Sequence, residues 1–247
     1  MRNWRIIAAL LATVALVLST SSAASAADSI DPALRTVAGT RVLFGHQSVG
    51  WNILDGMAGL YARRGVTPPR MVDQVTALPA QGRGFAQQAI GENGRPRSKF
   101  ADFAAAVDAG RNLRVAVMKL CFVDISGDTD PTALFAAYRR TISGIAARHP
   151  GVRLVHVTVP LTVPDPAANL ARQHYNRLMR STYGQRVFDL ARIESTRPDG
   201  SRVAGHLHGE RYFSLYRGYA ADEGHLNSEG ARRAARGFVQ AVASAAG

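Results

Sequence analysis

The chain has 247 residues, of which 47% are hydrophobic, 19% charged and 7% aromatic, and its formal net charge is +12. This composition supplies enough apolar side chains for a core and excludes a disordered chain, a collagen-like repeat and a coiled coil. A single cysteine, Cys121, excludes an intramolecular disulfide framework and a zinc site built from cysteines.

The first 27 residues have the order of a secretory signal peptide. Two arginines precede an apolar run from Ile6 to Leu18, and small residues follow up to Ala27. The run is shorter than the ~20 apolar residues that span a bilayer as a helix. We therefore expect residues 1–27 to be cleaved, the mature chain to be secreted or held in the cell envelope, and no stable membrane insertion. An uncleaved membrane anchor is the alternative.

The positive charge is spread along the chain. Removing the two arginines of the signal segment lowers the formal charge from +12 to +10, and nearly all of the remainder is arginine. The arginines form no block of like charges and do not alternate with aromatic residues, so the sequence predicts no nucleic-acid partner. A weak preference for anionic cell-surface polymers is the alternative, and the oligomeric state stays open.

Strand-like and helix-like segments alternate along residues 28–247. In chain order, the sequence predicts strand 41–45, helix 49–64, strand 71–75, a polar glycine-rich loop over 82–94, helix 100–110, strand 114–122, helix 131–149, strand 152–159, helix 170–178, strand 186–190 and a last helix from Asn227 or Ser228. Five strands separated by helices predict a mainly parallel sheet covered on both faces, a three-layer α/β/α sandwich in one domain.

Ligands of such sheets bind beyond the carboxyl ends of the strands, which selects residues 45–50, 121–124 and 222–225. Ser48 lies between a buried strand and a helix, where it is either a helix cap or a nucleophile. His225 has the residue type that removes a hydroxyl proton near neutral pH, and Asp222 is close enough to orient its ring. Together they predict a serine nucleophile with a histidine base.

The segments Val42-Leu-Phe-Gly-His-Gln-Ser48 and Asp222-Glu-Gly-His-Leu-Asn227 resemble the SGNH/GDSL hydrolases. This resemblance implies a flavodoxin-like α/β/α fold and an esterase, lipase or carbohydrate deacetylase activity. It also implies that Ser48 is the nucleophile, His225 the base and Asp222 its orienting acid. The family's oxyanion hole uses a glycine of a second block, for which Gly91 or Gly94 is similar in position.

Two departures from the family pattern concern the oxyanion hole. His46 and Gln47 precede Ser48 where the family has Gly-Asp, and Asp124 stands where its third block has asparagine. An ionised Asp124 cannot donate a hydrogen bond. Either Asn93, Gln47 or Asn52 replaces the missing donor, or Asp124 is protonated, or catalysis is weaker by the ~10²–10³-fold that one donor contributes.

The histidines outside the predicted triad invite a metal hypothesis. His206 and His208 alternate, and with His46, His225 or Asp222 they could offer nitrogen and oxygen ligands to zinc. Histidines two apart in a glycine-flanked loop are more typical of a surface or substrate contact, and His46 is also expected to contact substrate. The prediction is therefore no metal and no cofactor.

These observations lead to one functional hypothesis with two alternatives. We expect a secreted serine hydrolase that cleaves carboxylic esters, with an O-acetyl or other short acyl group on a saccharide as substrate. Ser48, His225 and Asp222 are the expected catalytic residues, and Gly91, Asn93, Asp124, His46 and Gln47 are expected at the oxyanion and substrate. The alternatives are a glycan-binding module with little or no turnover and an acyltransferase that uses the same triad.

Overall fold

The computed structural model describes residues 29–163 and 165–247. The expected signal peptide, residues 1–27, lies outside the described residues. Within the described ranges, no helix combines the length and the apolar character needed to cross a bilayer.

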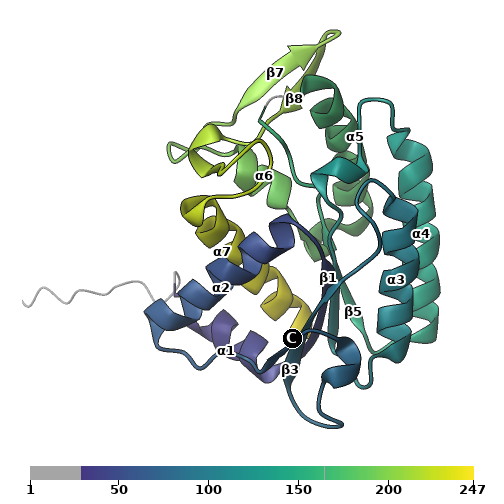
Figure 1. The fold of residues 1–247 in the computed structure, drawn as a ribbon, viewed down its shortest axis with the longest axis vertical. Helices are drawn as coiled ribbons and strands as arrows, with labels where there is room; N and C mark the ends of the chain where they lie inside the picture. Colours follow the sequence, from purple (N-terminus) through teal and green to yellow (C-terminus); the bar gives the residue numbers. More distant parts are fainter. Residues whose placement is uncertain (1–28, 164) are drawn as a thin grey trace, which may run out of the picture.

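In the described chain, a six-stranded parallel sheet forms the middle layer (Figure 1). Its strands are β1 (Arg41–His46), β2 (Met71–Val72), β3 (Gly84–Ala89), β4 (Val115–Met118), β5 (Arg153–Val157) and β6 (Val187–Phe188). Their order is β2-β3-β1-β4-β5-β6. Without the short edge strand β2, this is the strand order of a flavodoxin-like sheet. The predicted three-layer, flavodoxin-like fold is confirmed.

The predicted number of five strands is wrong, because β3 occupies part of the expected glycine-rich loop. β3 pairs with β1 along its whole length, and the expected strand 71–75 shrinks to the two residues of β2 at the sheet edge. Gln87 of β3 is buried, and both ends of its amide have partners. Its nitrogen donates to Asp73 (2.6 Å), and its oxygen contacts the His46 ring (3.1 Å). A glutamine satisfied by such partners can lie inside a sheet, which a hydrophobicity pattern does not reveal.

Helices cover both faces of the sheet (Figure 1). They are α1 (Asp31–Gly39), α2 (Val49–Arg64), α3 (Pro96–Ala109), α4 (Pro131–Arg148), α5 (Pro166–Tyr183), α6 (Leu190–Ser195) and α7 (Ser228–Ala246). Successive strand residues point to opposite faces. Phe44 accordingly packs in the core under α1, α2 and α7, whereas Leu43 belongs to the core under α3, α4 and α5.

Elements that the sequence did not predict are α1, the short helix α6 and an antiparallel hairpin. The hairpin consists of β7 (Ala204–Leu207) and β8 (Glu210–Phe213) and extends from the top of the view in Figure 1. His208 and Gly209 in its turn both have positive φ, 51° and 81°, as two-residue hairpin turns of the primed type require. His206 and His208 therefore lie on this hairpin.

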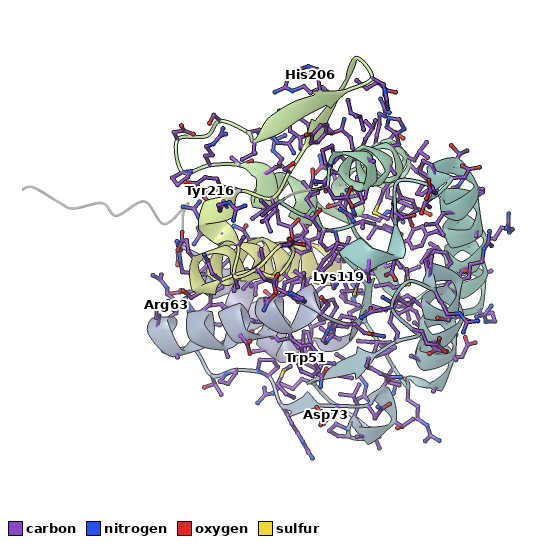
Figure 2. The ribbon with its side chains drawn as sticks, turned by 45° about the horizontal axis from the view of Figure 1, so that its top comes forward. Trp51, Arg63, Asp73, Lys119, His206 and Tyr216 are labelled. Carbon is purple, nitrogen blue, oxygen red and sulfur yellow. The ribbon has the colours of Figure 1, made fainter. Side chains whose placement is uncertain are left out.

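The strand order brings three loops together at the carboxyl edge of the sheet. β1 lies between β3 and β4, so the loops after these three strands, which contain Ser48, residues 90–94 and residues 121–124, leave the sheet side by side. Such a reversal of strand order is where open α/β sheets bind ligands. Figure 2 turns this edge forward and labels Trp51 and Lys119 near it.

Candidate active site

Ser48 forms a sharp turn between β1 and α2. Its φ of 53° and ψ of −117° lie in a region that non-glycine residues seldom occupy. Such a conformation costs on the order of 1–3 kcal/mol and persists only where its surroundings enforce it. The side chain caps no backbone N–H of α2, so helix capping does not explain the serine. The turn instead exposes its hydroxyl beyond the end of the sheet.

A line of hydrogen bonds joins Ser48, His225 and Asp222. The Ser48 Oγ lies 2.7 Å from Nε2 of His225, and Nδ1 of the same ring lies 2.7 Å from Oδ2 of Asp222. With a proton on Nδ1, the ring donates to Asp222 and turns the lone pair of Nε2 toward the serine hydroxyl. The spacing read from the sequence thus corresponds to direct contact in the structure.

The Asp222 carboxylate is held ionised by its own turn. The backbone N–H groups of Gly224 and His225 both donate to Oδ1, at 2.8 and 2.7 Å. These two bonds are the largest cause that lowers the pKa of Asp222 to about 2, and the His225 ring adds to the effect. Asp222 is therefore negatively charged near pH 7, and its charge faces the imidazole.

The loop that carries His225 is fixed from several sides. Asn52, one turn into α2, accepts a hydrogen bond from the N–H of Leu226 (3.1 Å). Asn227 caps α7 by accepting from the N–H groups of its first turn, as predicted for this position. The ring of Phe122, from the loop after β4, meets the His225 ring edge-on at 5.5 Å between centroids. These contacts set the position of the histidine relative to Ser48.

His46 lies beneath this site and does not line it, which corrects the expected substrate contact. The ring is 0% exposed, stacks on Phe44 and meets the edge of Trp51. Burial is the main reason why the pKa of His46 falls to about 4, so the ring is neutral near pH 7. A side chain on Gly50 would overlap the ring, so this glycine allows α2 to begin directly above it.

Gln47 and Gly91 serve as structural ties, although the sequence predicted them at the oxyanion. The Gln47 amide donates to the backbone carbonyls of Ile90 (2.8 Å) and Gly91, which fastens the loop after β3 to the serine turn. The N–H of Gly91 donates to Asp102 of α3 at 2.8 Å. Since these donors are occupied, neither the Gln47 side chain nor the Gly91 backbone offers an N–H to a bound oxyanion.

Asp124 is also occupied, in an ion pair that the sequence did not predict. Its carboxylate lies 2.6 Å from the ammonium group of Lys99, and both side chains are 0% exposed. It also accepts from the backbone N–H groups of Gly94 (2.9 Å) and Cys121 (2.6 Å). Asp124 is therefore an acceptor inside the protein and does not face the site. A lysine next to the apolar face of α3 was the only sequence signal for this pair.

Two of the expected donor groups remain at the edge of the sheet. The backbone N–H of Ser48 has no acceptor among residues 29–163 and 165–247. The side chain of Asn93 is exposed, its oxygen accepts from Lys99 (2.8 Å), and its Nδ2 donates to no other group in the described chain. Among the residues expected at the oxyanion and substrate, Asn93 thus has side-chain N–H groups that are available to a ligand.

The site holds no recognisable metal cluster in the described part of the chain. His206, labelled in Figure 2, lies on the hairpin, away from Trp51 and Lys119. The described residues contain no group of three or more histidine, cysteine or acidic side chains placed to hold a metal ion. The zinc hypothesis for His206 and His208 consequently has no ligand set around it.

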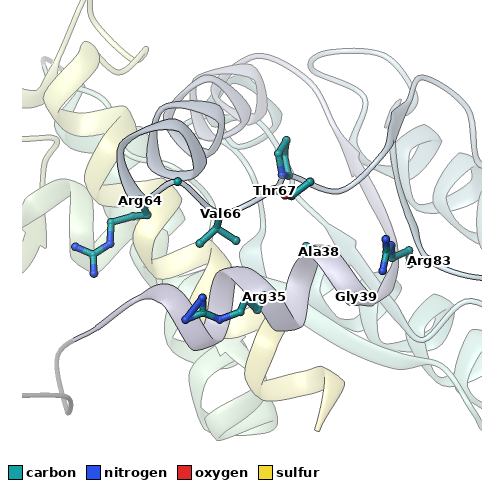
Figure 3. Close-up of a pocket in the computed structure, with 9 residues that line it drawn as sticks. Arg35, Ala38, Gly39, Arg64, Val66, Thr67 and Arg83 are labelled. Atoms are coloured by element: carbon teal, nitrogen blue, oxygen red, sulfur yellow. The ribbon is translucent and has the colours of Figure 1, made fainter.

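A hollow of about 410 Å³ lies at the opposite edge of the sheet (Figure 3). It is lined by three arginines, Arg35, Arg64 and Arg83, of which Arg64 pairs with Asp31 at 2.6 Å. α2 has 16 residues, so Arg64 at its end lies roughly 24 Å from its beginning at a rise of 1.5 Å per residue. This hollow is separate from the site around Ser48.

No family model matches the chain, and no curated protein matches it. Several solved structures are similar, and three of them serve as examples. The acetyl xylan esterase AlAXEase is 17% identical, with 82% of this chain and 99% of that chain covered and a TM-score of 0.49. A candidate platelet activating factor from Streptococcus pneumonia is 14% identical, with 84% and 89% covered and a TM-score of 0.48. A candidate lipolytic protein of the G-D-S-L family from Desulfitobacterium hafniense DCB-2 is 10% identical, with 82% and 99% covered and a TM-score of 0.46. The likeness to these proteins concerns the arrangement of sheet and helices.

Proposed function

We propose that the chain is a divergent SGNH/GDSL-type serine esterase, with Ser48 as nucleophile, His225 as base and Asp222 as the acid that orients it. The observation that carries this proposal is the continuous hydrogen-bonded line from the Ser48 hydroxyl through the imidazole to Asp222, at 2.7 Å for each contact. The strained backbone of Ser48 supports it, because such strain clusters at functional positions. The ionised Asp222 supplies the negative charge that stabilises an imidazolium.

In the proposed reaction, Nε2 of His225 takes the hydroxyl proton as the Ser48 Oγ bonds to the ester carbonyl carbon. The π electrons of the carbonyl move to its oxygen, and the Ser48 N–H donates to that oxyanion. Collapse of the intermediate breaks the bond to the alcohol, whose oxygen takes the proton from His225. Water that loses a proton to His225 then attacks the acyl-enzyme, releases the acid and restores Ser48.

The substrate that we propose is an O-acetyl or other short acyl ester on a saccharide, met outside the cytoplasm after cleavage of residues 1–27. The exposed indole of Trp51 supports a saccharide, since it lies three residues after Ser48 and is 47% exposed. The indole packs against the buried His46 ring in a T-shaped contact, which restricts its movement while part of its apolar surface stays exposed. Hydrolysis rates measured on a series of esters would determine the acyl chain length and the alcohol.

The nucleophile is tested with a fluorophosphonate probe and p-nitrophenyl acetate. Wild-type protein is expected to be labelled and to hydrolyse the ester, and Ser48→Ala to lose both by at least ~10³-fold. Ser181→Ala, which changes an exposed serine of α5, is the matched control and should behave as wild type. Equal labelling of wild type and Ser48→Ala would overturn the assignment.

The base is tested by the pH dependence of kcat/KM. Activity is expected to fall at acid pH, because an imidazolium at His225 cannot accept the serine proton. The pKa of Asp222 is lowered to about 2, so its carboxylate stays ionised over this range and its protonation does not explain the loss. A profile of p-nitrophenyl acetate hydrolysis that stays flat from pH 5 to 8 would contradict this role.

The same assays separate the alternative functions. A glycan-binding module would bind saccharide equally well with Ser48→Ala and would show no ester hydrolysis above background. An acyltransferase would give the acyl ester of an added alcohol in preference to the free acid, since an acceptor hydroxyl then replaces water at the acyl-enzyme.

A further inference from the structure

The buried ion pair of Lys99 and Asp124 connects the two loops that flank the serine turn. Lys99 lies in the first turn of α3, which follows the loop 90–94, and Asp124 ends the short turn after β4. Two fully buried charges are costly to desolvate, and such a pair is weak evidence for added stability. We therefore consider which neighbouring side chain the pair holds in place.

The Lys99 ammonium group fixes the side chain of Asn93. It donates to Oδ1 of Asn93 at 2.8 Å, and it also donates to Oδ2 of Asp124 at 2.6 Å. An ammonium group has no acceptor, so the amide must turn its oxygen toward Lys99 and its NH₂ group away. The bond is charge-assisted and stronger than a neutral one. Asn93 is thus an exposed side chain whose donor direction is set from inside the protein.

The loop that contains Asn93 is attached to the serine turn. Gln47, the residue before Ser48, donates to the carbonyls of Ile90 and Gly91, and the N–H of Ile90 donates to the carbonyl of His46. On its other side, the N–H of Gly94 donates to Asp124. Asn93 therefore stands between two anchored points of a loop that borders the nucleophile.

We propose that Nδ2 of Asn93 is an oxyanion donor and that Lys99 and Asp124 are the residues that position it. The inference rests on the proposed esterase function. When the Ser48 Oγ bonds to the carbonyl carbon, the π electron pair passes to the carbonyl oxygen and the hydroxyl proton passes to His225. The negative oxygen then accepts from the Ser48 N–H and from Nδ2 of Asn93. Both bonds are lost again when the carbonyl re-forms and the alkoxide leaves with the proton from His225.

The elimination of other donors supports this assignment. The backbone N–H of Gly91 and the side-chain amide of Gln47 donate within the protein, and Asp124 acts as an acceptor. Asn52 accepts from the N–H of Leu226 and so belongs to the support of the His225 loop. Asp124 cannot donate to an oxyanion, and in this proposal the side-chain amide of Asn93 does so instead. Asp124 holds the Lys99 ammonium group, which in turn orients the Asn93 amide.

The first test measures kcat and KM of p-nitrophenyl acetate hydrolysis for Asn93→Ala and Asn93→Asp. Loss of one oxyanion donor is expected to lower kcat by ~10²–10³-fold with KM within a few-fold of wild type. Glu92→Gln, which alters the neighbouring exposed side chain of the same loop, is the matched control and should retain kcat within about twofold. A kcat of Asn93→Ala within threefold of wild type would overturn the proposal.

The second test asks whether Lys99 and Asp124 act through Asn93. Single substitutions leave a buried charge unpaired, so the two are replaced together as Lys99→Met with Asp124→Asn, which can preserve a fold. This double variant is expected to lose kcat by more than tenfold, and adding Asn93→Ala should cost less than a further threefold. Multiplicative losses at an unchanged melting temperature would show that the pair does not act through Asn93.

The outcomes separate this inference from the proposed function. Hydrolysis that requires Ser48 and His225 but is indifferent to Asn93 rejects the inference and leaves the esterase intact. Wild-type protein that shows no Ser48-dependent labelling or hydrolysis rejects both.

Discussion

At Ser48 the chain adopts a backbone conformation that glycine reaches without strain, and the price in stability can be measured. Ser48→Gly is expected to exceed Ser48→Ala in free energy of unfolding by about 1 kcal/mol. Relief of strain is worth roughly 1–3 kcal/mol and is partly offset by the larger conformational entropy of unfolded glycine, ~0.5–1 kcal/mol. Urea denaturation of both variants provides the measurement.

Alanine is the matched control because both variants lack the hydroxyl that contacts His225. Only the backbone then differs between them. A Ser48→Gly variant that unfolds at lower urea concentration than Ser48→Ala would mean that the turn is not strained.

The sequence predicted individual site residues unevenly, for a physical reason. Ser48, Asp222 and His225 stand at positions that follow from the strand–helix order and from a short spacing within one turn. The role of Gly91 depends instead on whether its N–H is free, and Asp102, eleven residues later, occupies it. Such competition among partners is decided by side-chain geometry, which spacing does not contain.

Two neighbouring helices hold the two halves of the site, and their separation is set by a glycine. Gly56 of α2 faces the backbone of Ala231 in α7, and a Cβ at this position would overlap the carbonyl oxygen of Ala231. α2 begins next to Ser48, and α7 begins three residues after His225. The packing of this helix pair therefore sets the distance between hydroxyl and imidazole.

Gly56→Ala is expected to lower the free energy of unfolding by about 1–3 kcal/mol, as overpacking does, and to lower kcat more than tenfold. Gly59→Ala lies one turn further along α2, where the nearest atom is the flexible guanidinium end of Arg63 at 3.1 Å. There the higher helix propensity of alanine should stabilise the protein by up to about 1 kcal/mol. Thermal unfolding and p-nitrophenyl acetate kinetics compare the two. Equal behaviour would exclude a special role for the Gly56 contact.

Elements with a clear apolar pattern could be predicted, and those that depend on polar partners could not. The strands of the sheet centre and the helices α2, α4 and α7 carry continuous or periodic apolar residues. β3 is interrupted by Gln87 and Gln88, whose side chains are satisfied by Asp73, His46 and the N–H of Val75. No strand residue of the hairpin is fully buried, and Gly205 stands at one of the half-buried positions of β7, so the period of two carries little apolar signal.

The pH dependence of the whole fold should carry the signature of one buried acid, Glu194. Burial raises its pKa from the ordinary 4.5 to about 8. Between these values the unfolded chain has released the Glu194 proton that the folded protein keeps, so the contribution of Glu194 to stability falls as pH rises from 4.5 to 8. Glu194→Gln removes this dependence, because glutamine is neutral at every pH.

Urea unfolding at pH 4 and pH 9 tests this expectation. The advantage of Glu194→Gln over wild type should grow by a few kcal/mol between the two values, following ~1.4 kcal/mol per unit of pKa shift. Glu210→Gln, whose side chain is 55% exposed on the hairpin, is the matched control and should change little with pH. A wild-type loss between pH 4 and 9 that Glu194→Gln fully retains would assign it to other groups.

Ser48 and His225 are separated by 177 positions along the chain, which has a consequence for biosynthesis. Proteins are made from the amino end, so Ser48 is synthesised long before His225. In the proposed esterase, a polypeptide that lacks His225 and α7 carries an inert hydroxyl, and reactivity arises only when α7 docks beside α2. Synthesis and docking of α7 are thus the activating event in the proposed esterase.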